Sequence, residues 1–295
     1  MTILLLDVSE HQSGASAPDW AGIKAKNGGA GIIRVGYGNA HLDTMFVSNY
    51  TDMKKNGFKF LGLYQYLRAS QDPVSQAKAF CNWIGPPSAV APGTVFICDL
   101  EEGNGDQAPR AMAWHNFVDN FYGLSTRPLN ERSWLYSYTS FVTGHNLGAI
   151  FASNRHTWIA AYQSSPPVIG HTLWQSTDGK TGANITNWPG CGKCDTSQHN
   201  GTLATLAADA WPAAVTPPQP PAAPSFHGEY ITAGMFSLAD LCKNVLGVST
   251  NSALRATAVH YGSFEPILAT YINDIMTGKK PHTAPIPKGA KIWCN

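Results

Sequence analysis

Short apolar runs alternate with amphipathic segments from residue 3 to about residue 195. The runs are continuously apolar rather than alternating, which is typical of strands that are buried on both faces. They cover Ile3–Val8, Gly31–Tyr37, Phe58–Leu67, Val95–Leu100, Ser133–Ser137, Thr157–Ala161 and Thr172–Gln175, and a weaker candidate follows near Cys194. Buried strands separated by helices predict parallel pairing, with the helices covering the outside.

Helical segments lie between the early strands. They are predicted over Trp20–Asn27, Thr44–Asn56, Val74–Ile84 and Ala108–Tyr122. Asp72-Pro73 is a favourable helix start and Gly123 a favourable stop. The later connections, Tyr162–His171 and Thr177–Lys193, are too rich in Gly, Ser, Pro and Asn for helices. We therefore expect an α/β fold, a closed β/α barrel whose last part lacks full helices. The active site of such a barrel forms at the C-terminal ends of the strands.

The composition changes abruptly after Trp211. Six prolines, mixed with Ala and Val, lie between residues 212 and 224 and predict a stiff, extended linker. Helical patterning returns beyond it. We expect a barrel domain over residues 1–211, a linker over 212–225, and a small, mainly helical or α+β domain over 226–295.

Charge and hydropathy exclude several classes of protein. The chain has 20 Lys+Arg and 19 Asp+Glu, and this balance argues against a nucleic-acid binder held by bulk electrostatics. No apolar stretch approaches the ~20 residues of a membrane span. The apolar run Ile3–Leu6 is too short for a secretion signal, so we expect synthesis as a soluble cytoplasmic protein. The ten histidines include no HxH or HExxH arrangement, so we expect no metal and no cofactor.

Two carboxylates end the fourth predicted strand. Asp99 and Glu101 are one residue apart, so in a strand they point to the same face. Hydrolysis of a glycosidic bond needs such a pair, because one carboxyl protonates the leaving oxygen and its partner stabilises or attacks the anomeric carbon. Taken alone, the Asp-x-Glu pattern has an alternative interpretation, in which Asp99 only caps the following loop.

Other polar and aromatic residues end the neighbouring strands. Asp7 ends the first strand and Asp195 follows the last, and these strands are neighbours in a closed barrel. The rim residues, expected to bind a substrate, are Tyr37, Tyr64, Tyr66, Tyr136, Tyr138, Tyr162, Trp174 and Gln175. Acids surrounded by aromatic rings fit a glycan cleft, because sugar rings stack on aromatic side chains. Packing inside the barrel is the alternative for Tyr37, Tyr64 and Tyr66.

Seven segments together resemble one enzyme family. They are Asp7-Val-Ser-Glu-His-Gln12, Arg34-Val-Gly-Tyr37-Gly38, Gly62-Leu-Tyr-Gln-Tyr66, Asp99-Leu-Glu101, Trp134-Leu-Tyr-Ser137, Trp158-Ile-Ala-Ala-Tyr162 and Leu173-Trp-Gln175. In this order and approximate spacing they are similar to the family 25 glycoside hydrolases, the Chalaropsis-type lysozymes, which are frequent among bacteriophage endolysins. The resemblance covers residues 3–211. It implies a (β/α)5(β)3 TIM-like barrel that cleaves the β-1,4 bond between N-acetylmuramic acid and N-acetylglucosamine in peptidoglycan, with retention.

The resemblance also implies roles for the four acids. Glu101 matches the general acid/base, and Asp99 matches the second carboxylate, which is either the nucleophile or the group that orients the substrate acetamide. Asp7 and Asp195 match two further acids of the cleft. The chain departs from the family at Asp195-Thr196-Ser197, where Asp-x-Asn is usual, and it has a loop with Cys191 and Cys194 just before.

The resemblance and the linker together imply an endolysin. Such a protein is made in the host cytoplasm and acts on the cell wall after release, and residues 226–295 would bind the wall. Its partner would be peptidoglycan, with no nucleic acid and no membrane segment. The alternatives are a chitinase-like glycosidase and a non-catalytic barrel that binds glycans. The pairs Cys191/Cys194 and Cys242/Cys294 can each be a disulfide or free thiols.

Overall fold

The computed structural model describes residues 2–12, 17–208, 210, 230–231 and 291–292. The chain divides into two compact units, Met1–Val215 and Thr216–Asn295. In the second unit the described strands are β12 (Tyr230–Ile231) and β13 (Lys291–Ile292), which pair antiparallel. The proline-rich segment and the helices expected after it lie outside the described residues.

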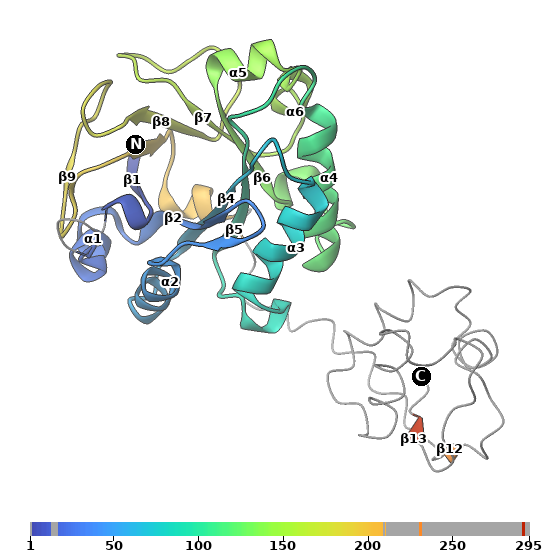
Figure 1. Ribbon diagram of the computed structural model, residues 1–295. Coiled ribbons are helices and arrows are strands. Elements are labelled where there is room, and N and C mark those ends of the chain that lie inside the picture. Colours follow the sequence, from blue (N-terminus) through green and yellow to red (C-terminus); the bar gives the residue numbers. More distant parts are fainter. Residues whose placement is uncertain (1, 13–16, 209, 211–229, 232–290, 293–295) are drawn as a thin grey trace. The chain divides into compact units, whose positions relative to one another are not determined.

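Eight strands of the first unit close into a ring (Figure 1). They are β1 (Ile3–Val8), β2 (Ala30–Tyr37), β4 (Phe60–Tyr66), β5 (Thr94–Asp99), β6 (Trp134–Tyr138), β7 (Thr157–Ala160), β8 (Leu173–Thr177) and β11 (Thr196–His199). The order around the ring is β1-β11-β8-β7-β6-β5-β4-β2, and β2 pairs with β1 to close it. The short strand β3 (His41–Leu42) is added at the edge of β2.

Seven strands of the ring run parallel, but β11 runs antiparallel to both its neighbours, β1 and β8. The expectation of parallel pairing is therefore wrong for this last strand. A hairpin of β9 (Asn187–Trp188) and β10 (Gly192–Lys193) precedes β11 and lies outside the ring. Because β8 ends at the same end of the ring as the other parallel strands and β11 is antiparallel to it, β11 starts at that end.

Helices lie outside the ring and follow the early strands (Figure 1). They are α1 (Trp20–Asn27), α2 (Phe46–Lys55), α3 (Pro73–Ile84), α4 (Ala108–Phe121), α5 (Thr139–Gly144) and α6 (Gly148–Phe151), with one-turn 3-10 segments at Glu10–Gln12, Pro87–Ala89 and Leu129–Glu131. The Asp72 carboxylate accepts from Ser75 N at 2.7 Å and caps α3. Gly123, at φ 69°, follows α4 in the left-handed region that favours glycine. Within the described residues, no helix is long and apolar enough to cross a membrane.

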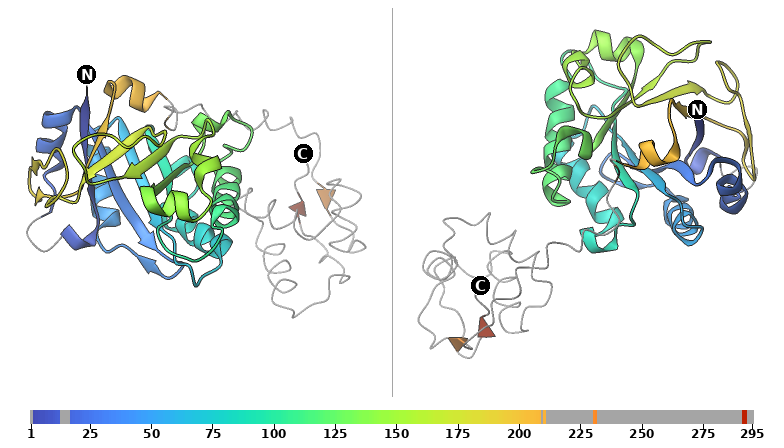
Figure 2. Two further views of the ribbon diagram at one scale, coloured as in Figure 1. Left: turned by 90° about the horizontal axis from the view of Figure 1, so that it is seen from above. Right: turned by 180° about the vertical axis from the view of Figure 1, so that it is seen from behind.

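Alternation along the strands separates two apolar layers. One layer fills the ring and includes Leu5, Ile32, Ile97, Trp134 and Trp158, and the other packs the ring against the helices. Helix α7 (Leu203–Ala207) lies across one end of the ring (Figure 2), where Leu206 joins the inner layer. That end is closed by apolar packing, so polar side chains that face inward gather at the opposite end.

The expected fold class, a TIM-like barrel with helices over its first part, is confirmed. Strand and helix positions agree with the sequence patterns to within a few residues. The short elements β3, β9, β10, α5 and α6 were not expected, since two to six residues carry too little periodicity to be recognised.

Candidate active site

Polar side chains form a cluster at the open end of the ring, because they occupy the next inward-facing positions after the apolar residues that fill it. Asp7 follows the inward Leu5, Asp99 follows the inward Ile97, and Gln175 follows the inward Leu173, each two residues later. All three side chains are buried. One rule of strand geometry therefore places groups from three separate strands, β1, β5 and β8, in one site.

Asp99 and Glu101 form a hydrogen-bonded pair of carboxyls. A hydrogen bond between two carboxyls needs a proton on one of them. Burial raises the pKa of Asp99 well above its ordinary value, and the neighbouring Glu101 raises it further. Burial also raises the pKa of Glu101, with Asp195 adding to the shift and the hydrogen bond from Asp99 opposing it.

The raised pKa of Glu101 is what a general acid needs, and burial is its main cause. The Asp99 Oδ1 atom is buried without a hydrogen-bond partner in the described part of the chain, so no hydrogen bond offsets the desolvation of this oxygen. Burial and the neighbouring Glu101 together make Asp99 harder to ionise than an exposed aspartate.

Asp7 and Asp195 meet across the closure of the barrel. The Asp7 amide donates to the Asp195 carbonyl at 3.0 Å. The Gln175 amide nitrogen donates to Asp7 Oδ2 at 2.8 Å and to Asp195 Oδ2 at 3.4 Å. Burial is the largest cause that raises the pKa of both acids, and for Asp7 the neighbouring Asp195 adds to it; the pKa of Asp195 rises to about 6. The two acids do meet as expected, although Asp195 precedes β11, the last strand of the ring, rather than following it.

Gln175 connects the acids to two tyrosines. Its Oε1 accepts from Tyr136 Oη at 2.8 Å and from Tyr162 Oη at 3.1 Å. An amide side chain has two N–H donors and two carbonyl lone pairs, and all four are used here. Gln175 is also 1% exposed. The role expected for it, direct binding of substrate, does not fit this environment, and the structure shows a bridge between groups instead.

Three tyrosines surround the acids directly. Tyr136 is buried and packs on Trp158 with 4.1 Å between ring centroids, and Tyr64 lies edge-on to the same indole at 6.1 Å. Burial and the charges of Asp7 and Asp99 raise the pKa of Tyr64. Tyr162 is 44% exposed, so its ring has a free surface on which a sugar can stack.

The remaining expected tyrosines lie further out. Tyr66 Oη donates to Glu102 at 3.4 Å, and Tyr37 stacks on His41 with 4.3 Å between centroids. Tyr138 lies beside Phe141 at 5.5 Å. Glu102 also accepts from Arg68 Nε at 3.2 Å and is half-buried. These residues form the wall of the mouth rather than its acidic centre.

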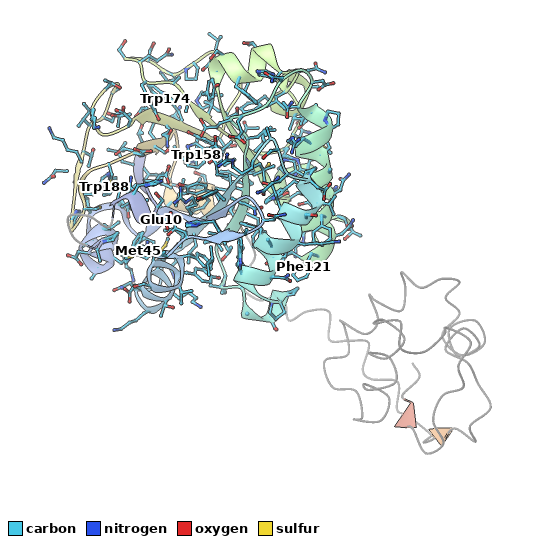
Figure 3. The ribbon with its side chains drawn as sticks, viewed as in Figure 1. Glu10, Met45, Phe121, Trp158, Trp174 and Trp188 are labelled. Carbon is cyan, nitrogen blue, oxygen red and sulfur yellow. The ribbon has the colours of Figure 1, made fainter. Side chains whose placement is uncertain are left out.

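Trp174 is on the opposite face of β8. It packs in the layer between strands and helices, is 3% exposed, and donates from Nε1 to the Ala161 carbonyl at 2.7 Å. In Figure 3 it lies at the periphery of the ring, whereas Trp158 points into the centre. The expectation that Trp174 faces the cleft does not agree with this position. Its neighbour Gln175 points inward, and strand alternation then turns Trp174 outward.

Sequence reasoning missed Arg34 and Trp158 as residues of the site. Arg34 donates from Nε to Asp43 at 2.8 Å and from Nη2 to Glu10 at 2.9 Å, and its charge lowers the pKa of Asp7 and Asp99. Trp158 Nε1 donates to Ser197 Oγ at 2.8 Å. The signal was available, because Arg34 follows the inward Ile32 by two residues and Trp158 lies on the inner face of β7.

The described residues hold no group of three or more His, Cys, Asp or Glu side chains arranged to bind a metal ion. The groups that the site does bring together are carboxyls, which can carry and release protons. A carboxyl pair with raised pKa values, with Asp7 and Asp195 beside it, is suited to general acid catalysis on a glycosidic oxygen.

The ionised acids of the site should lower the stability of the fold. The pKa of Asp195 is about 6 in the folded protein, against an ordinary value of 3.8. The part of the folding stability that depends on protonated Asp195 is therefore fully present below about pH 4, and it is lost as the pH rises through 6. We expect Asp195→Asn to raise the free energy of unfolding by about 2–3 kcal/mol at pH 7 and to change it little at pH 4. Urea unfolding at both pH values measures this, and equal effects at both would contradict the assigned pKa.

The comparisons with known proteins agree with this geometry. The family model of glycosyl hydrolases family 25 matches residues 6–185. A family GH25 lysozyme from Aspergillus fumigatus superposes with a TM-score of 0.55 and 22% identity, over 71% of this chain and 99% of that one. The catalytic domain of the endolysin ply40 from bacteriophage P40 of Listeria monocytogenes gives a TM-score of 0.56 and 22% identity, over 70% and 98%.

A bacterial lysozyme from Streptomyces coelicolor matches with a TM-score of 0.54 and 22% identity, over 70% of this chain and 96% of that one. No curated protein sequence matches the chain. At these identities the structural matches show a shared fold, whereas the family model matches more than half of the sequence and includes Asp7, Asp99 and Glu101. The chain therefore belongs to glycosyl hydrolase family 25 and is a glycoside hydrolase.

Proposed function

We propose that this glycoside hydrolase is a muramidase of the endolysin type. It cleaves the β-1,4 bond between N-acetylmuramic acid and N-acetylglucosamine in peptidoglycan, with retention, and acts on the wall after release from the cell that makes it. The observation that carries the proposal is the hydrogen-bonded Asp99–Glu101 pair among the inward acids. The named relatives, lysozymes and an endolysin catalytic domain, support the substrate class. The role of residues 226–295 in wall binding stays a prediction.

Glu101 supplies the proton in this mechanism. Its raised pKa keeps a proton on this carboxyl at a higher pH than on an exposed glutamate, and the glycosidic oxygen takes it as the bond breaks. Asp99 then carries the negative charge that remains on the pair, beside the positive charge that develops at the anomeric carbon. Burial of Asp99 strengthens this interaction, because the local dielectric is low.

The hydrogen bond between Asp99 and Glu101 also bears on how retention is achieved. A carboxylate nucleophile stands about 5–5.5 Å from the acid carboxyl in retaining glycosidases, whereas these two carboxyls are close enough to share a hydrogen bond. We infer that Asp99 orients the substrate acetamide, whose carbonyl oxygen attacks the anomeric carbon. Asp99 accepts the acetamide N–H, which makes that oxygen more nucleophilic.

Product analysis of digested peptidoglycan tests the proposal. We expect mass spectrometry to find new reducing ends on N-acetylmuramic acid, with the β anomer formed first in NMR time courses. Walls stripped of N-acetyl groups should resist cleavage, and chemical re-acetylation should restore it. Reducing ends on N-acetylglucosamine would instead favour a chitinase-like specificity, and an absence of new ends from folded protein would favour a glycan-binding barrel. Rapid cleavage of de-acetylated walls would assign Asp99 as the nucleophile.

A further inference from the structure

The hairpin before Asp195 carries two cysteines at close range. Cys191 Sγ and Cys194 Sγ are 3.7 Å apart. Cys194 is 2% exposed, whereas Cys191 is half-buried and so within reach of a small reagent. Cys81 and Cys98, the other cysteines in the described part of the chain, are buried in the layer between strands and helices. The hairpin therefore holds a thiol pair with one accessible member.

This hairpin is fastened to the strand that follows Asp195. Trp188 Nε1 donates to Thr196 Oγ1 at 2.9 Å, and Thr196 Oγ1 donates to the Cys194 carbonyl at 3.1 Å. Asp195 lies between the two residues that this second bond connects, and its own carbonyl accepts from the Asp7 amide at 3.0 Å. The position of the Asp195 backbone thus depends on Cys194 on one side and on Asp7 on the other.

The far side of the hairpin is held by helix α1. Lys26 Nζ donates to the Asn187 carbonyl at 2.7 Å and lies over the Trp188 ring, 5.1 Å from its centroid. The Asp19 amide donates to the Pro189 carbonyl at 3.1 Å. With β9 and the turn fixed in this way, Cys191 and Cys194 are kept near each other by contacts that do not involve their sulfur atoms.

We propose that Cys191 and Cys194 are a redox-modification site, in which a low-molecular-weight disulfide converts the two thiols to an intramolecular disulfide that restrains the segment carrying Asp195. The Sγ–Sγ distance in a disulfide is about 2.05 Å. The two sulfur atoms, now 3.7 Å apart, are already in van der Waals contact and need only a short approach to form the bond. The inference is independent of which glycosidic bond the enzyme cleaves.

The reaction balances as two thiol–disulfide exchanges. The Cys191 thiolate attacks one sulfur of the small disulfide, forms a mixed disulfide and expels one small thiolate. Cys194 then loses its proton and attacks Cys191 Sγ, which forms the Cys191–Cys194 bond and expels the second small thiolate. The pair is oxidised by two electrons, the reagent is reduced to two thiols, and the two protons released by the cysteines pass to them. A hydrogen bond from Cys194 lowers the pKa of Cys191, which favours this cysteine as the first nucleophile.

Trypsin provides a direct test, because Lys193 lies between the two cysteines. Folded full-length protein is incubated with oxidised glutathione or with dithiothreitol, free thiols are alkylated, and the denatured protein is digested. Cleavage after Lys193 separates peptide 181–193 from peptide 194–243. We expect the two peptides to stay linked after glutathione treatment and to separate after dithiothreitol. The second peptide also contains Cys242, so Cys194→Ser is the matched control and should abolish the link.

Thermal unfolding tests the restraint. We expect the oxidised form to unfold about 2–6 °C higher than the reduced form, since the disulfide closes a short loop in a domain of this size. The difference should vanish in Cys191→Ser, which has a serine of similar size in the same place. Separate peptides after glutathione treatment, or a link that persists in Cys194→Ser, would overturn the site. A correct link without any change in the unfolding temperature would overturn the restraint on Asp195.

Discussion

Glu101→Gln should lower the turnover of peptidoglycan by about 10²–10⁴-fold, the usual contribution of a positioned general acid. The amide keeps the shape of the side chain but has no proton acidic enough for the leaving oxygen. The hydrogen bond to Asp99 can persist, because the amide N–H can donate to it, so the fold should remain intact. The measurement is kcat and KM on solubilised glycan chains, with circular dichroism as the check of folding.

Glu102→Gln is the matched control, since it makes the same chemical change at the next residue. Glu102 accepts from Tyr66 Oη, Arg68 Nε and the Ala69 amide, and so contributes to the wall of the mouth. We expect its activity to stay within a few-fold of the wild type. If Glu101→Gln retained most of its turnover, or if both variants lost the same amount, the assignment of the proton donor to Glu101 would be wrong.

Much of the site could be predicted from the sequence because strand alternation is strict. Once Asp99 and Glu101 were placed at the end of a buried strand, their common direction followed from a period of two residues. The same rule, applied from Ile32, turns Arg34 into the barrel, and applied from Leu173 it separates Gln175 from Trp174. Trp174 was misplaced because it was assigned from its place near the end of the strand, without applying the alternation between it and Gln175.

Other features depend on contacts that no local pattern encodes. The last strand was expected near Cys194, yet β11 begins at Thr196 and runs antiparallel to its neighbours. That direction follows from the preceding hairpin and its contacts with α1, which join residues far apart in the chain. The raised pKa of Glu101 is likewise a property of burial in the assembled barrel. Its direction could be anticipated from the function, but its physical cause could not.

Gln175→Glu should lower kcat by about 10²–10³-fold, comparable with the loss of one hydrogen-bond donor from a catalytic centre. The change keeps the shape of the side chain, and a carboxylate oxygen can still accept the hydrogen bonds from Tyr136 Oη and Tyr162 Oη. It removes the N–H groups that donate to Asp7 Oδ2 and Asp195 Oδ2. An ionised carboxyl there would add a further negative charge among buried acids and so raise the pKa of Asp7 and Asp195 further.

The pH dependence separates this positioning role from simple loss of packing. Because the folded-state pKa values of the acids rise, stability in Gln175→Glu should fall more steeply than in the wild type as the pH increases through 6. The activity that remains should be largest on the acidic side, where the new carboxyl is protonated and can donate one hydrogen bond.

Trp174→Phe is the matched control on the same strand. It loses the bond from Nε1 to the Ala161 carbonyl, on the face away from the acids. We expect this control to lower the unfolding temperature at all pH values while its kcat, KM and pH profile stay close to the wild type. A pH profile of Gln175→Glu that matched the wild type would show that Gln175 does not set the charge state of Asp7 and Asp195.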